Sequence, residues 1–151
     1  MRKNAWFHKP KKISGIPTDN RRTAEATCWK WFSLMIRLRD ADDNGYSQCF
    51  TCWARKHYKE MDAGHFKSVG AHPNLKYDEM NCHSQCTSCN QHHHGNLDIY
   101  TERMIELYGP EILVILKVQE QLHHRATSQD YRRMAAEYRE KANVMLKRMP
   151  L

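Results

Sequence analysis

The two segments Cys49-Phe50-Thr51-Cys52 and Cys86-Thr87-Ser88-Cys89 decide what kind of fold this chain of 151 residues can form. Each has the Cys-x2-Cys spacing that places two thiolates on one metal ion, and zinc favours four thiolates in a tetrahedron. Small domains use such a site to replace hydrophobic core that they lack. The spacing therefore predicts a structural Zn²⁺ held by Cys49, Cys52, Cys86 and Cys89, whose closed coordination leaves no position for chemistry.

Two further cysteines lie outside these pairs. Cys28 directly precedes an aromatic stretch, residues 29–32, which predicts a buried apolar thiol. Cys82 is an alternative zinc ligand. No apolar stretch follows the N-terminal charges, so we see no secretory signal and expect metal rather than disulfides. The competing interpretation is four unrelated thiols or a redox pair.

Three polar side chains near the cysteine pairs are suited to hydrolysis. His65 ends the segment Asp62-Ala63-Gly64-His65, Asn81 lies five residues before Cys86, and Asn90 directly follows Cys89. A neutral histidine can take a proton from water. Asparagine oxygens suit a hard divalent ion such as Mg²⁺, and such an ion offsets charge on a phosphate group. This set predicts hydrolysis of a phosphodiester.

The order of these residues over about residues 49–96 resembles the HNH endonucleases, which have a ββα-metal fold. The resemblance implies that His65 is the general base and that Asn81 orients it. It also implies that Asn90 binds the catalytic ion, Mg²⁺ or Mn²⁺. His94 follows four residues later, and it would be a second ligand on the same face if a helix runs there.

One position departs from the HNH pattern. Many relatives carry an Asp or His metal ligand directly before the base, where this chain has Gly64. Asp62 is the substitute that we expect. Each residue also has a structural interpretation: His65 as a histidine packed near the zinc site, Asn81 as the cap of a turn, and residues 92–94 as solvent-facing histidines.

A closer resemblance covers more of the chain. The segments Ile36-Arg37-Leu38-Arg39-Asp40, Met61-Asp62-Ala63-Gly64-His65-Phe66 and Gly95-Asn96-x3-Tyr100, together with the cysteine pairs, resemble the NinG family of lambdoid phages, also called Rap. The resemblance implies a phage-encoded recombination nuclease that acts on branched DNA, such as Holliday junctions and D-loops. It would work in the cytoplasm of the bacterial host.

Charge and composition restrict the partners of the chain. The net charge is +7, and 27% of the residues are charged against 40% hydrophobic residues. Such a basic chain favours polyanions, nucleic acid above all. The longest apolar run, Ile112–Leu116, is far shorter than the roughly 20 residues that span a bilayer. We therefore expect DNA as the partner and no membrane.

The predicted organisation is α+β, with a small zinc-stapled ββα-metal (HNH) core flanked by an N-terminal helix and C-terminal helices. Residues 1–22 form a basic arm, 23–45 a helix that packs on the core, 46–98 the core, and 99–151 the C-terminal helices. In the first helix, Thr23 to about Asp40, apolar residues at 31, 34, 35 and 38 line one face. A capping box at Thr127 opens the last helix, and Gly109 ends an earlier one.

Basic residues at both ends of the chain are candidate phosphate contacts. The predicted nucleic-acid-binding residues are Lys9, Lys11, Lys12, Arg21 and Arg22 in the arm, and Arg132 and Arg133 in the last helix. The alternative for the arm is a solvating tail, and a basic helix is also usual on a solvated surface.

Two other functions compete with a junction-selective nuclease. A non-catalytic treble-clef zinc module that binds DNA or RNA would need only the cysteines and the basic surface. A sequence-specific homing or restriction-type HNH enzyme would need a separate recognition domain, which is not apparent. Because a junction is resolved by two symmetric cuts, a homodimer through the helices after residue 98 is plausible.

Overall fold

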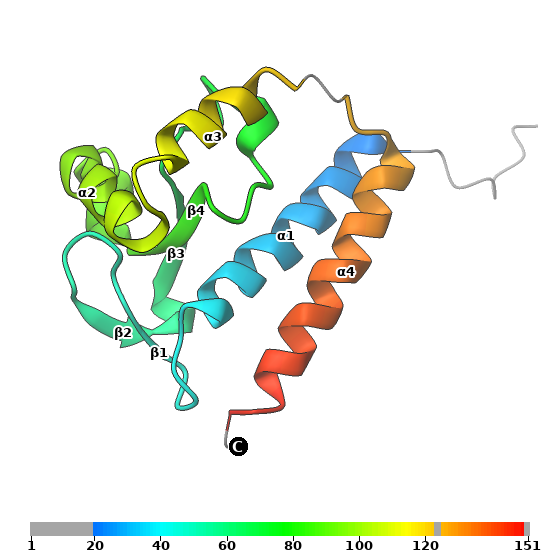
Figure 1. Cartoon of the computed structure of the whole chain (residues 1–151). Helices are drawn as coiled ribbons and strands as arrows, with labels where there is room; N and C mark the ends of the chain where they lie inside the picture. The colour runs from blue at the N-terminus through cyan, green and yellow to red at the C-terminus, as the bar shows by residue number, and fades with distance from the viewer. Residues whose placement is uncertain (1–19, 123–124, 150–151) are drawn as a thin grey trace, which may run out of the picture.

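The computed structural model describes residues 20–122 and 125–149 (Figure 1). This part of the chain is mixed α and β, as predicted. The elements in order are α1 (Arg21–Arg39), β1 (Tyr46–Gln48), β2 (Arg55–His57), η1 (Tyr58–Glu60), β3 (Met61–His65), η2 (Pro73–Leu75), β4 (Cys82–Cys86), η3 (Ser88–His92), α2 (Leu97–Tyr108), α3 (Ile112–Glu120) and α4 (Ser128–Leu146).

Two small antiparallel sheets flank the two Cys-x2-Cys segments. Strand β1 pairs with β2, and β3 pairs with β4 in a register that sets Met61 opposite Cys86 and His65 opposite Cys82. Since side chains alternate along a strand, Asp62, Gly64 and their partners project from one face of the β3–β4 hairpin, and His65 projects from the other. All five residues of β4 are buried, because the hairpin is covered on both faces.

Helices α1 and α4 lie side by side and run in the same direction (Figure 1). The core between them and the hairpin includes Cys28, Phe32 and Met35 of α1 with Tyr138 and Ala142 of α4. The predicted helix is confirmed, but its buried stripe is rotated. Residues 31 and 34 are only partly buried, because α4 packs nearer to the side of α1 that carries Cys28 and Phe32.

Helices α2 and α3 cover the other face of the hairpin (Figure 1). A second core joins Phe66 and Leu75 to Tyr100 and Met104 of α2 and to Ile112 and Leu116 of α3. Helix α2 ends at Gly109, whose φ of 83° is a left-handed conformation that glycine adopts without strain. The capping box of α4 is also confirmed, with the Thr127 and Asp130 side chains each accepting from the other's backbone N–H.

One predicted boundary differs from the structure. Arg21 and Arg22 are in the first turn of α1, which Asn20 caps through its side chain, so they do not belong to an extended arm. Lys9, Lys11 and Lys12 lie outside the described residues. Within the described ranges, no helix has the length and apolar character that crossing a membrane requires.

Candidate functional site

The four cysteines predicted to bind zinc come together at the Cys86 end of the hairpin. Their sulfur atoms all lie within 4.8 Å of one another, and the Cys52 and Cys86 Sγ atoms are 3.7 Å apart. A tetrahedron with Zn–S bonds of about 2.3 Å has S···S edges of about 3.8 Å. All six cysteines of the chain are free. The donor set and its spacing therefore fit a zinc ion.

Local backbone geometry forms this cluster. The Cys49 N–H donates to the Ala54 carbonyl at 2.9 Å, and the Trp53 N–H donates to the Cys49 carbonyl at 3.0 Å. This tight turn brings Cys52 back beside Cys49. On the other side, β4 ends at Cys86, and the turn of η3 carries Cys89. The Asn96 amide donates to the Cys89 sulfur at 3.5 Å, which is a hydrogen bond that supports a thiolate.

The electrostatics of the cluster favour a bound cation. Burial would raise the pKa of the Cys49 thiol, but backbone hydrogen bonds from Cys86, Thr51 and Cys52 outweigh it and lower that pKa to about 6. Burial and the neighbouring cysteines raise the pKa of Cys52 to about 12. The Cys49 thiolate thus forms readily, but its negative charge disfavours deprotonation of the neighbouring thiols. Four thiolates can therefore coexist only around a bound dication.

Cys28 and Cys82 are not part of the cluster. Both are fully buried, Cys28 between α1 and α4 and Cys82 at the far end of the hairpin. Burial raises the pKa of the Cys28 thiol to about 11 and also raises the pKa of Cys82. The prediction of a buried apolar Cys28 is confirmed, and Cys82 does not lie with the proposed zinc ligands.

His65 lies at the end of β3, and its ring is fixed from two sides. Its Nε2 is 2.8 Å from the Lys76 carbonyl oxygen, so this nitrogen carries the proton and donates. The imidazole stacks on Trp29 of α1 with ring centroids 5.5 Å apart. Burial lowers the pKa of His65, which keeps the imidazole neutral near pH 7. The lone pair of Nδ1 can then accept a proton.

Asn81 is fully buried, and it holds the loop between β3 and β4. Its Oδ1 accepts from the Lys67 N–H at 2.8 Å, while its amide donates to the carbonyls of Lys67 at 3.0 Å and Leu75 at 3.2 Å. Leu75 directly precedes Lys76, whose carbonyl holds His65. Asn81 and His65 are therefore linked through the backbone of this loop. None of these hydrogen bonds joins the two side chains directly.

Asp62 and Asn90 meet at the other end of β3. The Asp62 Oδ2 accepts from the Asn90 amide at 3.1 Å and from the Gln91 amide at 3.1 Å. Asp62 and His65 are three residues apart in an extended strand, which separates their Cα atoms by about 10 Å and turns their side chains to opposite faces. The structure thus brings Asp62 to Asn90 but not to His65.

Gln85 occupies the space that a side chain at position 64 would take. A Cβ atom added to Gly64 would lie 2.0 Å from the Gln85 Oε1, so no larger residue fits there unless Gln85 moves. The Gln85 amide donates to Thr51 Oγ1 at 3.0 Å and to the Gly95 carbonyl at 2.9 Å, while its buried Oε1 has no hydrogen-bond partner among the described residues. Only the strand register reveals this pairing, so sequence reasoning missed it.

The histidine run after Cys89 differs from its predicted helical arrangement. The π-type turn η3 ends at His92, and His94 has a φ of 49°, which is left-handed backbone. His94 therefore does not continue a helix from Asn90, and the expectation that the two share one helical face is wrong. The side chains of residues 92–94 are exposed.

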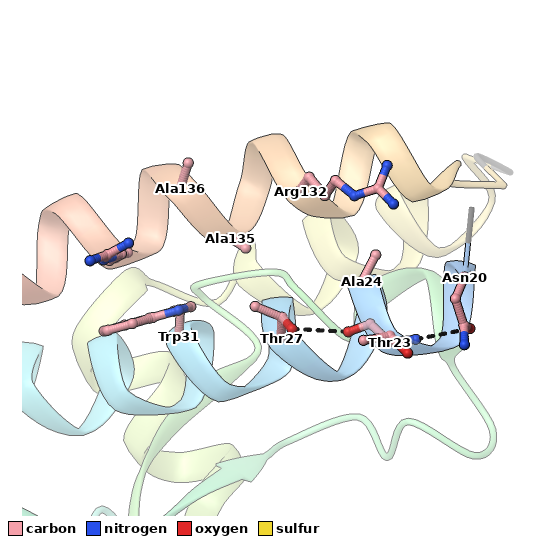
Figure 2. A pocket seen from close by; sticks show the side chains of 9 residues that line it. Asn20, Thr23, Ala24, Thr27, Trp31, Arg132, Ala135 and Ala136 are labelled. Carbon is pink, nitrogen blue, oxygen red and sulfur yellow. Dashed lines mark hydrogen bonds between the residues drawn. The ribbon is translucent and has the colours of Figure 1, made fainter. Parts of the chain in front are cut away.

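Part of the predicted nucleic-acid surface forms a groove between α1 and α4. Figure 2 shows Thr23, Thr27 and Trp31 of α1 along this groove, with Arg132 on α4. The groove has a volume of about 530 Å³, and Arg139 lies 5.5 Å from the centre of the Trp31 ring. None of the described residues that line it is acidic. Arg139 follows Arg132 by seven residues, or two helical turns, but it was not among the predicted contacts.

Two other predicted basic contacts, Arg21 and Arg133, interact elsewhere. The Arg21 guanidinium donates to the Ala126 carbonyl at 3.0 Å and to the Tyr131 hydroxyl at 3.2 Å, which ties α1 to the start of α4. Arg133 pairs with Asp130 at 3.3 Å. Arg22 is exposed in the first turn of α1. Of the arginines predicted in the last helix, only Arg132 lines the groove.

The fold and the cysteine cluster define an α+β protein with a four-cysteine site of the zinc-binding type beside a β-hairpin. A family model described as Bacteriophage Lambda NinG protein matches residues 8–148. The chain therefore belongs to the NinG family. It is 36% identical to protein ninG of Salmonella phage P22 over 110 residues, which is 72% of this chain and 51% of that protein.

Two further relatives come from other phages. The chain is 35% identical to protein ninG of Escherichia phage lambda over 109 residues, 72% of this chain and 50% of the relative. It is 46% identical to protein ninG of Enterobacteria phage H19B over 52 residues, 34% of this chain and 26% of the relative. The chain thus spans about half the length of its P22 and lambda relatives. No solved structure matches it significantly.

Proposed function

We propose that this protein is a metal-dependent DNA endonuclease in which β3, β4 and the turn η3 form a ββα-metal core of the HNH kind. The observation that carries the proposal is the arrangement of His65. Its Nε2 is tethered to the Lys76 carbonyl at 2.8 Å, and Asn81 fixes the same loop through the backbone of Lys67 and Leu75. This leaves a neutral imidazole with a defined tautomer, as a general base requires.

His65 takes a proton from water at Nδ1 in the proposed reaction. The Lys76 carbonyl holds the proton on Nε2, and the stacked Trp29 keeps the ring from rotating. Burial favours the neutral ring before the reaction, and release of the proton to solvent regenerates it. The water that is activated attacks the phosphorus atom of a phosphodiester, and a P–O bond of the DNA strand breaks.

A divalent ion such as Mg²⁺ or Mn²⁺ would supply charge stabilisation for the phosphate and the leaving oxygen. Hard cations of this kind prefer oxygen ligands. The oxygens available near the start of η3 are the Asp62 carboxylate, the Asn90 side-chain carbonyl and the Gln85 Oε1, which lacks a hydrogen-bond partner among the described residues. These residues lie on the face of the hairpin opposite to His65, so the proposed reaction requires the ion and the His65 Nδ1 to be brought to one phosphate when DNA binds.

The zinc ion is structural in this proposal, and DNA is held elsewhere. Four cysteines would close the coordination of zinc, so the ion fixes β1, β4 and η3 relative to one another. Arg132 and Arg139 line a groove without acidic residues, which suits a phosphate backbone. The relatives are phage proteins. We therefore propose action inside a bacterial host, with branched recombination intermediates as the substrate class.

A non-catalytic zinc module that binds nucleic acid is the second candidate function. It is favoured by one observation: His65 lies on the opposite face of the hairpin from Asp62 and Asn90, and near its other end. Gln85 also fills the space beside Gly64, where HNH enzymes often place a metal ligand. A module of this kind needs the cysteine cluster and the basic groove, but not a free His65 Nδ1.

A cleavage experiment tests the proposal. A labelled four-way junction and the corresponding linear duplex are incubated with the purified protein, with Mg²⁺, with Mn²⁺ or without added ion. We expect ion-dependent cuts in the junction. His65→Ala should lower the rate roughly 100- to 10,000-fold while zinc content and junction binding stay unchanged, because a general base acts only in the chemical step.

The matched control is His92→Ala, which removes an exposed histidine near the cysteine cluster and should leave the rate unchanged. Cleavage by His65→Ala at the rate of the wild type would contradict the proposal. Binding without cleavage under every ion condition would favour the zinc module.

A further inference from the structure

Trp53 has a backbone conformation that is unusual for a tryptophan. It directly follows the Cys49–Cys52 turn with a φ of 60°, in the left-handed region that favours glycine. The conformation is required by the turn, because the Trp53 N–H donates to the Cys49 carbonyl at 3.0 Å. A residue with a side chain costs free energy there that glycine would not. The indole is nevertheless 50% exposed.

The exposed indole is part of a group of aromatic rings and guanidinium groups. The Arg103 guanidinium lies 5.5 Å from the centre of the Trp53 ring, and the Arg55 guanidinium lies 4.9 Å from the centre of the Tyr46 ring. The Tyr46 side chain is 43% exposed. All four residues, with the exposed Leu107, line one cavity of about 400 Å³. We call this cavity the Trp53–Tyr46 pocket.

Packing in the hydrophobic core does not explain why a tryptophan stands at position 53. Phe50, the ring beneath this pocket, is already covered by His83, with which it stacks at a centroid distance of 4.0 Å. The zinc-type turn also does not need the indole, because it is closed by backbone bonds. A strained and half-exposed tryptophan beside Arg103, in one pocket with Tyr46 and Arg55, points to a ligand with a flat π-face.

The charged groups around the pocket say less about its ligand than the exposed aromatic rings do. Asp40 and Asp42 also line the pocket, but Asp42 is paired with Arg55 and Asp40 with Arg39. Arg103 similarly has Glu106 at 2.7 Å. The local charges therefore nearly balance. Aromatic rings with adjacent guanidinium groups are the platform on which proteins stack unpaired bases, whatever the base sequence.

We propose that the Trp53–Tyr46 pocket binds an unpaired nucleobase of a DNA strand, which stacks on Trp53 or Tyr46. This proposal rests on the proposed function in one respect, namely that DNA is the ligand. A base inside a continuous duplex has both faces covered by its neighbours, so the pocket selects single-stranded or branched DNA. The pocket is formed by β1, the Cys49–Cys52 turn and α2, whereas the basic groove is formed by α1 and α4.

The test compares Trp53→Gly with Trp53→Phe. Binding of a short fluorescent oligothymidylate and of a duplex of the same length is measured without added Mg²⁺, together with zinc content and thermal unfolding. Glycine fits the left-handed backbone, and relief of that strain offsets the larger entropy of the unfolded chain, so Trp53→Gly should keep its zinc and unfold at nearly the same temperature. Its affinity for the single strand should fall roughly 5- to 100-fold, the effect of one lost base stack.

Duplex affinity should change less than twofold in Trp53→Gly, and Trp53→Phe should keep most of the single-strand affinity. Tyr46→Ala should weaken single-strand binding in the same way. Because stacking carries the effect, the loss should be similar at low and high salt. Unchanged single-strand affinity in both Trp53→Gly and Tyr46→Ala would overturn the proposal. Lost zinc or a lower unfolding temperature in Trp53→Gly would assign Trp53 a structural role and also overturn it.

The nuclease proposal can fail independently of this one. If the wild type binds the single strand through Trp53 but never cleaves DNA, the pocket stands and the HNH function falls. If the wild type cleaves a junction and both Trp53→Gly and Tyr46→Ala bind single strands normally, the function stands and the pocket proposal falls.

Discussion

The two ends of the β3–β4 hairpin are held by different physical means. The Met61–Cys86 end meets the cysteine cluster, whose sulfur atoms lie within 4.8 Å of one another. The His65–Cys82 end is held by the three hydrogen bonds of Asn81 and by the stacking of His65 on Trp29. With zinc bound, the first end would depend on a few strong metal–ligand bonds, whereas the second depends on many weak contacts. Substitutions at the two ends should therefore differ in size and in kind.

The largest effect is expected at the metal end. Cys86→Ser should abolish zinc binding and unfold the region around the hairpin, because the binding free energy of a structural zinc, on the order of 10 kcal/mol, is coupled to folding. Elemental analysis and circular dichroism measure both outcomes. Cys82→Ala, at the other end of β4, is the matched control and should keep one zinc per chain. Folded Cys86→Ser without zinc would show that the cluster does not hold the fold.

A smaller effect is expected at the His65 end. Asn81→Ala removes one buried acceptor and one donor group, and it leaves the Lys67 N–H and the carbonyls of Lys67 and Leu75 without this partner. Each buried unsatisfied group costs about 1–3 kcal/mol. We expect a loss of about 3 kcal/mol in the free energy of unfolding by urea, with zinc content unchanged. Zinc loss in this variant would mean that the two ends are not independent.

The middle of the hairpin is sensitive to steric fit. Gly64→Ala would place a Cβ atom 2.0 Å from the Gln85 Oε1, and overpacking of this kind costs about 1–3 kcal/mol. The double variant Gly64→Ala, Gln85→Ala should recover part of that loss, since the clashing atom is gone. A double-mutant cycle of unfolding free energies measures the coupling. Additive losses would mean that Gln85 does not occupy this space in solution.

The last expected effect is a dependence of stability on pH through His83, on the face of the hairpin covered by α2. The effect is small for each pH unit. Burial and nearby Arg39 lower the pKa of His83 to about 3, and its two nitrogens lie 3.0 Å and 2.9 Å from the hydroxyls of Tyr100 and Tyr108. The unfolded imidazole has a pKa near 6.5. Above that pH both states are neutral, so the native structure keeps this contribution to stability.

Below pH 6.5 the unfolded chain binds a proton that the folded protein excludes. The free energy of unfolding should then fall by about 1.4 kcal/mol per pH unit through this group, down to about pH 3. NMR titration should find His83 neutral at pH 5 in the folded protein. His83→Gln should have a shallower pH slope, and comparison with the wild type removes the contribution of acid-induced zinc release, which both share. A charged His83 at pH 5 would contradict the prediction.

Much of the fold could be predicted from local patterns. The helix start at Thr127 depends on a side chain three residues away, and the helix end at Gly109 depends on the backbone freedom of one residue. The boundary at α1 was predicted two residues late, because the cap is Asn20 rather than a later residue. The candidate site was predicted less completely. The cysteines cluster as expected, but Asp62 and Asn90 lie apart from His65.

By itself, the sequence determined the α+β class and the four cysteines that come together, because Cys-x2-Cys spacing and helix caps act over two to four residues. Tertiary structure decided the surroundings of His65, the place of Gln85 beside Gly64 and the groove that joins Trp31 to Arg139. These contacts join residues far apart in the chain or on paired strands. Their geometry follows from strand register and helix packing, which no short segment encodes.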